Sequence, residues 1–293
     1  MNRRLRFALF GNTFQAKKST SVQKLLVLLE ERKAEILIDQ QLYDFLTKDM
    51  QITVNPSELI SGNDFQADVV VSRGGDGTFL EAARRVGDKE IPILGINMGR
   101  LGFLADFSPE DIAPAINQIY AGEARTELRS VLQIEYSQGK PKGYPFALNE
   151  VAVLKRDNSS MISIRVDING EYLTTYQADG LIVSTPTGST AYSLSNGGPV
   201  VVPGTGVFIM TAVAPHSLNI RPVVIPDSAE VTLDVESRNH SFLVAIDGRS
   251  EKCGEGTRIT LRRAPYNIQV VKRSGTRYFS TLREKLMWGA DVR

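Results

Sequence analysis

In the first third of the chain, short apolar runs alternate with segments whose apolar residues recur every three to four positions. The apolar runs predict strands at residues 6–10, 35–39, 68–71 and 91–96. The segments between them predict helices at residues 19–33, 40–48 and 78–86. The run at 68–71 holds three consecutive valines, as expected for a strand covered on both faces. This alternation predicts an α/β domain with a doubly wound parallel sheet.

From about residue 127 the period of the apolar positions changes to two. Ile162, Ile164, Val166 and Ile168 alternate with polar residues, and Asn169-Gly170 then supplies a strong hairpin turn. Alternation returns at 231–236 and in shorter runs at 259–261 and 268–271. We expect a β-rich second domain of two packed sheets. The predicted boundaries are 1–126, 127–275 and a C-terminal segment 276–293, helical over 281–288, that returns to the first domain.

Composition and charge narrow the classes of partner. The 293 residues are 42% hydrophobic and 23% charged, which is ordinary for a globular protein. A formal net charge of +1 argues against nucleic acid as the main partner. The single cysteine cannot form an internal disulfide, and no stretch approaches the ~20 apolar residues that span a bilayer. We therefore expect a soluble cytoplasmic protein with no membrane or nucleic-acid partner.

The sharpest chemical signal is the glycine-rich turn Gly74-Gly75-Asp76-Gly77, which joins a buried strand to a helix. Missing side chains let backbone amides approach phosphate oxygens, and the start of the helix favours negative charge. Asp76 repels phosphate, so we expect it to orient a hydroxyl group or to hold a magnesium ion. Alternatively, the glycines make only a tight turn that Asp76 caps. The spacing matches neither a Walker A nor a Rossmann motif.

Two further segments carry polar groups next to apolar strands. Residues 179–199 form a dense run of hydroxyl side chains around Gly188, suited to ribose and base recognition, or else to a Ser/Thr turn and helix cap. Asn149-Glu150 interrupts an apolar strand, so both side chains need hydrogen-bond partners if they are buried. Vicinal ribose hydroxyls would satisfy them; a salt bridge in a loop is the alternative.

Taken together, these segments resemble the NAD kinase family over nearly the whole chain. The glycine-rich turn alone is shared with diacylglycerol, sphingosine and phosphofructokinase families. The resemblance rests on that turn together with residues 97–104, Asn149-Glu150, 179–199, 214–218, Arg221-Pro222 and Asp247-Gly248, in this order.

The resemblance implies an enzyme that transfers the γ-phosphate of ATP to the 2′-hydroxyl of the NAD adenosine ribose, giving NADP. It implies Mg²⁺ or another divalent cation bound with ATP, no dedicated metal-ligand set, and a homo-oligomer that is a dimer or tetramer. Asp76 would act at the 2′-hydroxyl, and the phosphate-transfer loop would be Gly74, Gly75 and Gly77. The NAD-binding residues would be Gly77, Phe103, Asn149, Glu150, Asp179, Thr190, Ala191, Ser195 and Asp247.

Phosphoryl transfer depends mainly on positioning and charge neutralisation. Asp76 could then act as a base, as an orienting group or as a metal ligand. Two rivals remain at this stage: a lipid kinase that shares the turn, and an NAD-binding sensor without catalysis. The sequence does not decide whether the donor is ATP or polyphosphate, or whether the acceptor is NAD or NADH. It also leaves open feedback by NADPH and the size of the oligomer.

Overall fold

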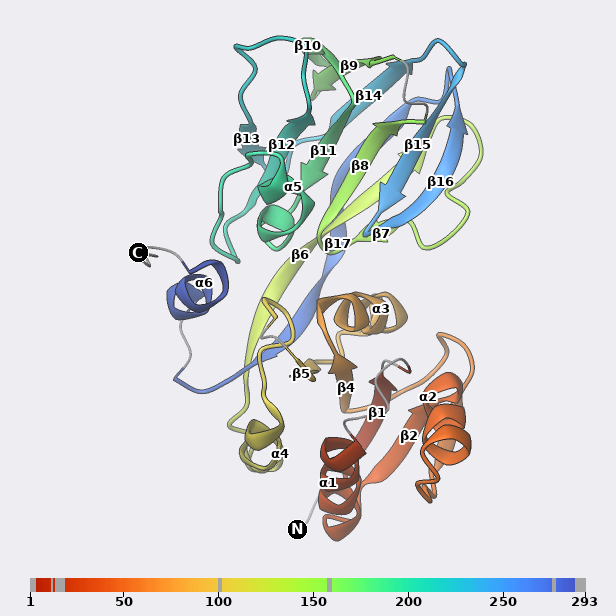
Figure 1. The fold of residues 1–293 in the computed structure, drawn as a ribbon, viewed down its shortest axis with the longest axis vertical. Helices are drawn as coiled ribbons and strands as arrows, with labels where there is room; N and C mark the ends of the chain where they lie inside the picture. Colours follow the sequence, from red (N-terminus) through yellow and green to blue (C-terminus); the bar gives the residue numbers. More distant parts are fainter. Residues whose placement is uncertain are drawn as a thin grey trace. The chain divides into compact units, whose positions relative to one another are not determined.

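The chain divides into two compact units, one formed by Met1–Leu128 with Ile268–Arg293 and the other by Arg129–Asn267. The computed structural model describes residues 4–11, 13, 19–99, 102–156, 160–275 and 278–287 (Figure 1). Arg100 and Leu101 of the family segment, and Trp288 of the predicted C-terminal helix, lie outside the described residues.

The first unit is built on a parallel sheet with the strand order β5-β4-β1-β2-β3. The strands are β1 (Arg6–Gly11), β2 (Glu35–Asp39), β3 (Glu58–Ile60), β4 (Val69–Gly74) and β5 (Ile93–Asn97). The helices are α1 (Ser19–Glu31), α2 (Gln40–Asp44), the π-helical η2 (Phe45–Asp49), α3 (Asp76–Val86), the short η3 (Pro109–Asp111), α4 (Ile112–Ala121) and α6 (Tyr278–Leu286). The predicted α/β class is confirmed.

The strand order places the glycine-rich turn at a distinctive position in this sheet. β2 and β3 follow β1 on one side, whereas β4 pairs with the other side of β1. Open α/β sheets bind ligands at the carboxyl ends of strands where the order reverses in this way. Gly74 is the last residue of β4, so the turn lies at such a point.

The first unit contains a strand, β3, that the sequence pattern did not predict, and it differs from the pattern in three further places. Helix α3 begins at Asp76 rather than at residue 78, which puts Asp76 in its first turn. The helix expected over 40–48 is split, because α2 continues as η2. The pattern gave no forecast of α4, whose buried residues Ile112, Ala115 and Ile116 join the core of this unit.

The second unit is a pair of packed β-sheets, as predicted. One sheet has the order β10-β9-β14-β17 and the other has the order β13-β12-β11-β8-β15-β16. The strands are β6 (Arg125–Tyr136), β7 (Phe146–Ala147), β8 (Glu150–Lys155), β9 (Ile162–Ile168), β10 (Glu171–Ala178), β11 (Gly180–Ser184), β12 (Val207–Val213), β13 (Val223–Pro226), β14 (Val231–Glu236), β15 (Ser241–Ile246), β16 (Arg249–Gly254) and β17 (Ile259–Lys272). The short elements η4 (Gly188–Thr190) and α5 (Tyr192–Ser195) follow β11.

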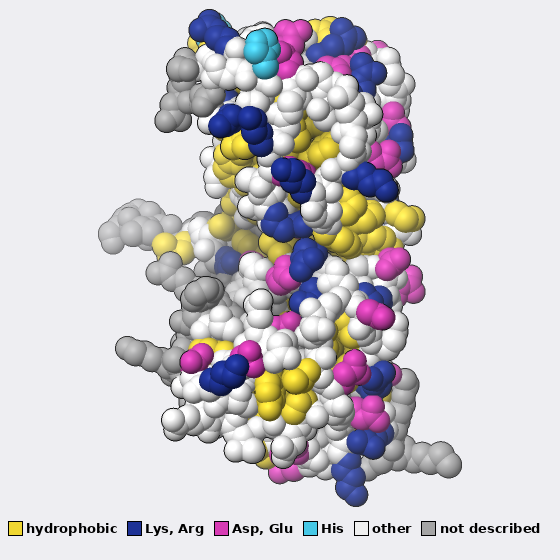
Figure 2. All heavy atoms as spheres, turned by 90° about the vertical axis from the view of Figure 1, so that its right-hand side faces the viewer, with side chains coloured by type: hydrophobic (Ala, Val, Ile, Leu, Met, Phe, Trp, Pro, Cys, Tyr) yellow, Lys and Arg dark blue, Asp and Glu magenta, His cyan; other side chains and the backbone are white. Residues whose placement is uncertain are grey.

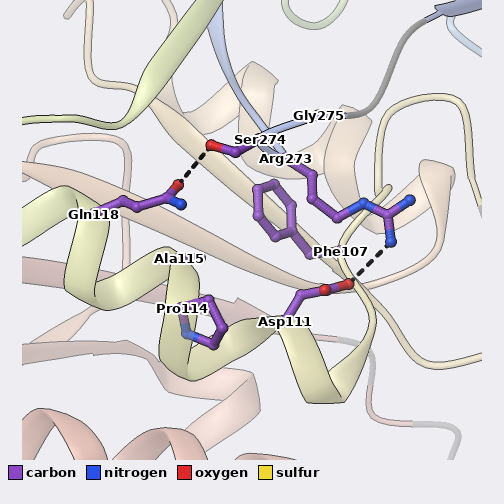
Figure 3. Close-up of a pocket in the computed structure, with 8 residues that line it drawn as sticks. All are labelled: Phe107, Asp111, Pro114, Ala115, Gln118, Arg273, Ser274 and Gly275. Carbon is purple, nitrogen blue, oxygen red and sulfur yellow. Dashed lines mark hydrogen bonds and ion pairs between the residues drawn. The ribbon is translucent and has the colours of Figure 1, made fainter.

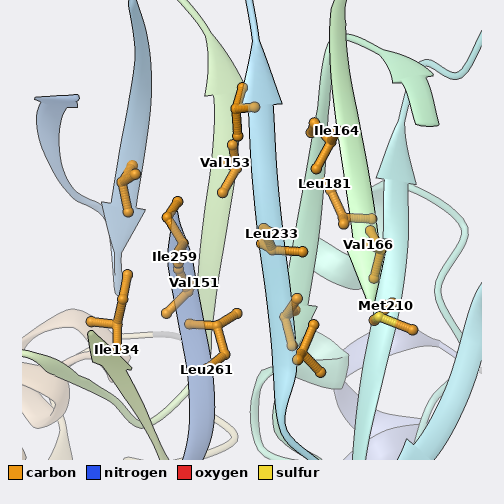
Figure 4. Close-up of a cluster of buried hydrophobic side chains, with 14 of the residues drawn as sticks. Ile134, Val151, Val153, Ile164, Val166, Leu181, Met210, Leu233, Ile259 and Leu261 are labelled. Atoms are coloured by element: carbon orange, nitrogen blue, oxygen red, sulfur yellow. The ribbon is translucent and has the colours of Figure 1, made fainter. Parts of the chain in front are cut away.

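The period-two positions of the second unit form its core. Ile164 and Val166 of β9 meet Val151 and Val153 of β8 and Leu181 of β11 in one buried cluster drawn from both sheets (Figure 4). The predicted Asn169-Gly170 hairpin joins β9 to β10, with φ values of 52° and 80° at its two residues. The runs 259–261 and 268–271 belong to the single strand β17, which pairs with β14 near its start and with β5 near its end.

Two features of the described residues concern membranes and surface charge. Within the described residues, no helix is both long and apolar enough to cross a bilayer. On the face shown in Figure 2, acidic and basic side chains are interspersed.

Candidate functional site

The glycine-rich turn connects β4 directly to α3. Gly75 is the N-cap of α3, and Asp76 and Gly77 form its first turn. The backbone N–H groups of a first helical turn have no partners within the helix, so they are available to an anionic ligand. The turn therefore presents amide donors at the carboxyl end of the sheet.

The three glycines of the turn do different things. A Cβ atom added at Gly74 would lie 2.1 Å from the Thr78 hydroxyl oxygen, so Gly74 is needed for the close approach of the chain to itself. A Cβ added at Gly75 or Gly77 would meet nothing within 4 Å. These two positions thus keep open space beside the amides, which is what the approach of a phosphate requires.

The Asp76 carboxylate organises the loop that follows β5. Its Oδ2 accepts the backbone N–H of Phe103 at 3.0 Å, and its Oδ1 accepts those of Leu104 and Ala105 at 3.1 and 3.0 Å. A Cβ added at Gly102 would lie 2.0 Å from Oδ1, so only glycine allows the carboxylate to approach this closely. In the sequence, Gly102 was noted only as part of the family segment at residues 97–104. No pattern in the sequence predicted its contact with Asp76.

A lysine from the C-terminal helix completes the surroundings of Asp76. The Lys285 Nζ lies 3.5 Å from Asp76 Oδ2 and 4.6 Å from the centre of the Phe103 ring. The sequence analysis assigned no role to Lys285. No local motif could have found it, because the pair joins positions more than 200 residues apart.

The surroundings of Asp76 are compatible with a magnesium ion that is bound mainly by substrate phosphates. The described residues contain no group of three His, Cys, Asp or Glu side chains arranged to hold a metal ion. An ionised carboxylate accepts about four hydrogen bonds, and Asp76 already accepts three from amides. Magnesium commonly uses one or two carboxylates together with phosphate oxygens and water, so it needs no protein cage here.

In the second unit, Asp247 holds the turn before β8 in place. Asp247 and Gly248 form the two-residue hairpin between β15 and β16, with φ values of 46° and 79°. The Asp247 carboxylate accepts the backbone N–H groups of Leu148, Asn149 and Glu150 at 2.8, 2.8 and 3.1 Å. Asp-Gly between alternating strands is the same hairpin signal as Asn169-Gly170, so the turn itself was readable from the sequence.

Glu150 is a buried carboxyl group with an unused acceptor. Its residue is 8% exposed, and its Oε2 has no hydrogen-bond partner within the described part of the chain. Burial, and after it the nearby charge of Asp247, raises the pKa of Glu150 to about 7, and a hydrogen bond from the Tyr192 backbone opposes the rise. Asn149 is also buried, at 9% exposed. Glu150 thus has an acceptor that a ligand hydroxyl could satisfy.

The hydroxyl-rich segment packs directly against this turn. Thr185 donates its backbone N–H to the Asn149 carbonyl at 2.9 Å and its hydroxyl to the Leu148 carbonyl at 2.6 Å. A Cβ added at Gly188 would lie 2.1 Å from the Asn149 carbonyl oxygen. The structure therefore brings Asn149 and Glu150 together with the start of the 179–199 segment.

The other predicted nucleoside-binding residues of that segment lie a few residues further on. Thr190 ends η4 and donates its hydroxyl to the Thr187 carbonyl, Ala191 links η4 to α5, and Ser195 ends α5 with an exposed side chain. Both elements follow the end of β11 that pairs with Glu150. Their roles in binding stay predictions.

Asp179 lies at the opposite end of β11. It precedes Gly180, which pairs with Leu154, whereas Ser184 at the far end of the strand pairs with Glu150. Asp179 is five residues from Ser184, a separation of roughly 17 Å along the strand. Asp179 forms an ion pair with Lys155, with 2.7 Å between Nζ and Oδ1. Within this unit, the fold does not bring Asp179 to Glu150.

Three cavities lie away from these turns. In the first unit, a cavity of about 440 Å³ is lined by Phe107, Asp111, Pro114, Ala115, Gln118, Arg273, Ser274 and Gly275 (Figure 3). Two cavities of the second unit share Ser163, Gln177, Glu236 and Glu255. None of these three contains a predicted site residue.

Comparison with known proteins gives the same result for both halves of the chain. The family described as ATP-NAD kinase N-terminal domain matches residues 7–124, and that described as ATP-NAD kinase C-terminal domain matches residues 148–273. A protein of Bacteroides fragilis named NAD kinase is 59% identical over 289 residues, covering 99% of this chain and all of that protein. An NAD kinase of Porphyromonas gingivalis is 40% identical over 98% of this chain and 99% of its own length.

Solved structures support the same fold. The structure of yeast NADH kinase complexed with NADH matches with a TM-score of 0.88 at 22% identity, over 99% of this chain and 89% of that one. The structure of an NAD kinase from Archaeoglobus fulgidus in complex with ATP matches with a TM-score of 0.74 at 27% identity, over 96% of this chain and 99% of that one.

Proposed function

The chain belongs to the ATP-NAD kinase family, and from this premise we propose how its residues transfer a phosphate from ATP to NAD. The enzyme is an NAD kinase: a relative named so is 59% identical over the whole chain. The product is NADP, formed on the 2′-hydroxyl of the adenosine ribose, and the reaction takes place in the cytoplasm.

We assign the role of Asp76 from the hydrogen bonds that its carboxylate accepts. Three of its roughly four acceptor positions bind the amides of residues 103–105, which fixes the orientation of the group. Oδ2 accepts only one of the three amides, so it is the oxygen with a further acceptor position for the hydrogen of a ribose hydroxyl. Asp76 thus acts chiefly by orienting the 2′-hydroxyl toward the γ-phosphorus. It accepts the hydroxyl proton late in a loose transition state, as the bond from the γ-phosphorus to the leaving ADP oxygen breaks.

The glycines beside Asp76 receive the phosphates. Gly75 and Gly77 leave space at the first turn of α3, and the unpaired amides of that turn donate to phosphate oxygens. When bound with ATP, a divalent cation supplies charge neutralisation and holds the phosphate oxygens in a fixed arrangement. Asp76 is the carboxylate of this turn that could add one ligand to it.

The second unit supplies the groups that recognise NAD. Buried Asn149 and Glu150 offer an amide and a carboxyl group for vicinal ribose hydroxyls. Thr190, Ala191 and Ser195 add neutral donors, acceptors and a small surface for the nucleoside. Asp247 contributes by holding Asn149 and Glu150 through their backbones. Phe103 shapes the dinucleotide pocket from the loop that Asp76 organises.

A homo-oligomer, a dimer or a tetramer, accounts for Asp179. This residue lies at the other end of β11 from Glu150, so we expect it to act on a ligand held by a second copy of the chain. Sedimentation analysis of the purified protein tests this point, and a monomer that is fully active would contradict it.

The experiment that tests the proposed function is NADP formation by the purified protein with Mg-ATP and NAD, beside the Asp76→Asn variant. We expect product from the wild type and a loss of turnover in the variant that exceeds its loss of NAD affinity. Because an amide cannot accept all three backbone N–H groups, the thermal stability of the variant is measured in parallel. Folded wild-type protein that yields no NADP with ATP, polyphosphate or NADH would contradict the proposal.

A further inference from the structure

The C-terminal helix α6 carries a cation to the glycine-rich turn. Lys285 has its Nζ 3.5 Å from Asp76 Oδ2, and its side chain is 24% exposed. From this geometry, and resting on the proposed function, we propose that Lys285 is a further catalytic residue, which binds an oxygen of the ATP triphosphate beside the turn.

The packing of α6 fixes the direction of this side chain. Thr281 and Leu282 are the buried residues of the helix, and Lys285 lies four and three positions after them. Side chains with these spacings lie on one face of a helix. The face that anchors α6 is therefore the face that presents Lys285 to Asp76, whereas Arg283 and Glu284 are exposed.

The surroundings of the ammonium group limit its movement. It lies 4.6 Å from the centre of the Phe103 ring, within the range of a cation–π contact. Phe103 in turn donates its backbone N–H to Asp76. Lys285, Phe103 and Asp76 thus form one connected group, so the lysine is held near the turn before any substrate arrives.

The positive charge of Lys285 offsets the negative charge of Asp76 at the turn. The Asp76 carboxylate repels an approaching phosphate, and in a partly buried position this repulsion is stronger than in water. An ammonium group at 3.5 Å offsets that charge. An ammonium has three N–H donors, and Lys285 forms an ion pair with Asp76 Oδ2 at 3.5 Å, so its donors can bind phosphate oxygens. Lysine acts toward phosphates as a compact point charge, which suits this role.

A purely structural lysine would give a different result from a phosphate-binding one. If Lys285 only positioned Asp76, its loss would lower kcat and leave ATP affinity unchanged. If Lys285 binds the triphosphate, its loss weakens ATP binding itself. The affinity for a non-hydrolysable ATP analogue with Mg²⁺ therefore separates the two cases without relying on turnover.

The test compares Lys285→Met, Lys285→Arg and the matched control Arg283→Met, which removes the same charge from an exposed position of the same helix. We measure kcat, the KM for ATP, the Kd of the analogue by calorimetry, and the melting temperature. Lys285→Met should raise the KM and the Kd at least ~10-fold, the usual range for one charge-assisted hydrogen bond. Lys285→Arg should recover part of this loss, and Arg283→Met should stay within about twofold of wild type.

Unchanged analogue affinity in folded Lys285→Met overturns the inference, even if kcat falls. An equal loss in Arg283→Met overturns it as well, because the effect would then come from the general charge of the helix. The proposed function is tested separately. NADP formation by the wild type supports it whatever the role of Lys285. Binding of the analogue reports on Lys285 even if no NADP forms.

Discussion

The Asp247 carboxylate accepts the backbone N–H of Asn149 at 2.8 Å across 98 positions of sequence. It also accepts the N–H groups of Leu148 and Glu150. In the first unit, Asp76 holds the loop at residues 103–105 in the same way. Each unit therefore uses one aspartate to fix the backbone of a segment that carries predicted substrate-binding residues.

Replacing Asp247 should cost both stability and NAD binding. In Asp247→Asn, the amide NH₂ group faces at least one backbone donor, so hydrogen bonds are lost and one donor stays unsatisfied. We expect the free energy of unfolding to fall by roughly 2–4 kcal/mol and the KM for NAD to rise. Urea unfolding and steady-state kinetics measure the two effects.

Asp234→Asn is the matched control for this prediction, because Asp234 pairs with Arg258 at the surface. Such pairs contribute about 1 kcal/mol or less. Equal losses of stability in the two variants would show that the three amide bonds of Asp247 have no special weight.

Glu150 should make stability depend on pH between its unfolded and folded pKa values. Its pKa rises from 4.5 to about 7 on folding, chiefly through burial. Its contribution is therefore complete below pH 4.5 and is lost as the pH rises toward 7, a change of roughly 3 kcal/mol. Glu150→Gln cannot ionise and should escape this loss.

Urea unfolding of both proteins between pH 4.5 and 8 checks the Glu150 prediction. The stability of Glu150→Gln relative to the wild type should increase with pH and level off above about pH 7. A constant difference across this range would mean that Glu150 does not titrate there.

Replacing Gly77 should impair activity without loss of stability. Gly77→Ala places a methyl group in open space and improves helix propensity, so the folded state should be as stable as wild type or up to ~1 kcal/mol more stable. The methyl group occupies space assigned to phosphate, so the KM for ATP should rise. Thermal melting and kinetics give both values.

Gly74→Ala is the converse control, because its Cβ would lie 2.1 Å from the Thr78 hydroxyl oxygen. This variant should lose stability. If Gly77→Ala keeps wild-type kinetics, phosphate does not approach the turn at that position.

Gly188 should be irreplaceable for a different reason. Its Cβ would lie 2.1 Å from the Asn149 carbonyl oxygen, a backbone atom that cannot turn away as a side chain could. Gly188→Ala should therefore displace the Asn149-Glu150 turn and reduce NAD binding more than ATP binding. Gly254→Ala serves as the control, because its added Cβ would meet nothing within 4 Å and its φ is not positive. Similar losses for both nucleotides in Gly188→Ala would point to general unfolding instead.

The sequence by itself determined the two fold classes and the position of the glycine-rich turn. Local periodicity fixes which face of a segment is buried, so the valines of β4 and the alternating residues of β9 were readable directly. Turn chemistry placed the Asn169-Gly170 hairpin for the same reason. Periodicity did not show that β17 is one strand, because two consecutive exposed residues, Arg262 and Arg263, break the alternation in its middle.

Only the tertiary structure decided what surrounds the candidate residues. It showed that Asp76 holds residues 103–105, that Asp247 holds residues 148–150, and that Lys285 lies beside Asp76. It also separated Asp179 from Glu150 along β11. These relationships join segments far apart in the chain, and hydrogen bonds at such separations follow from strand order and register, which no local pattern of residues encodes.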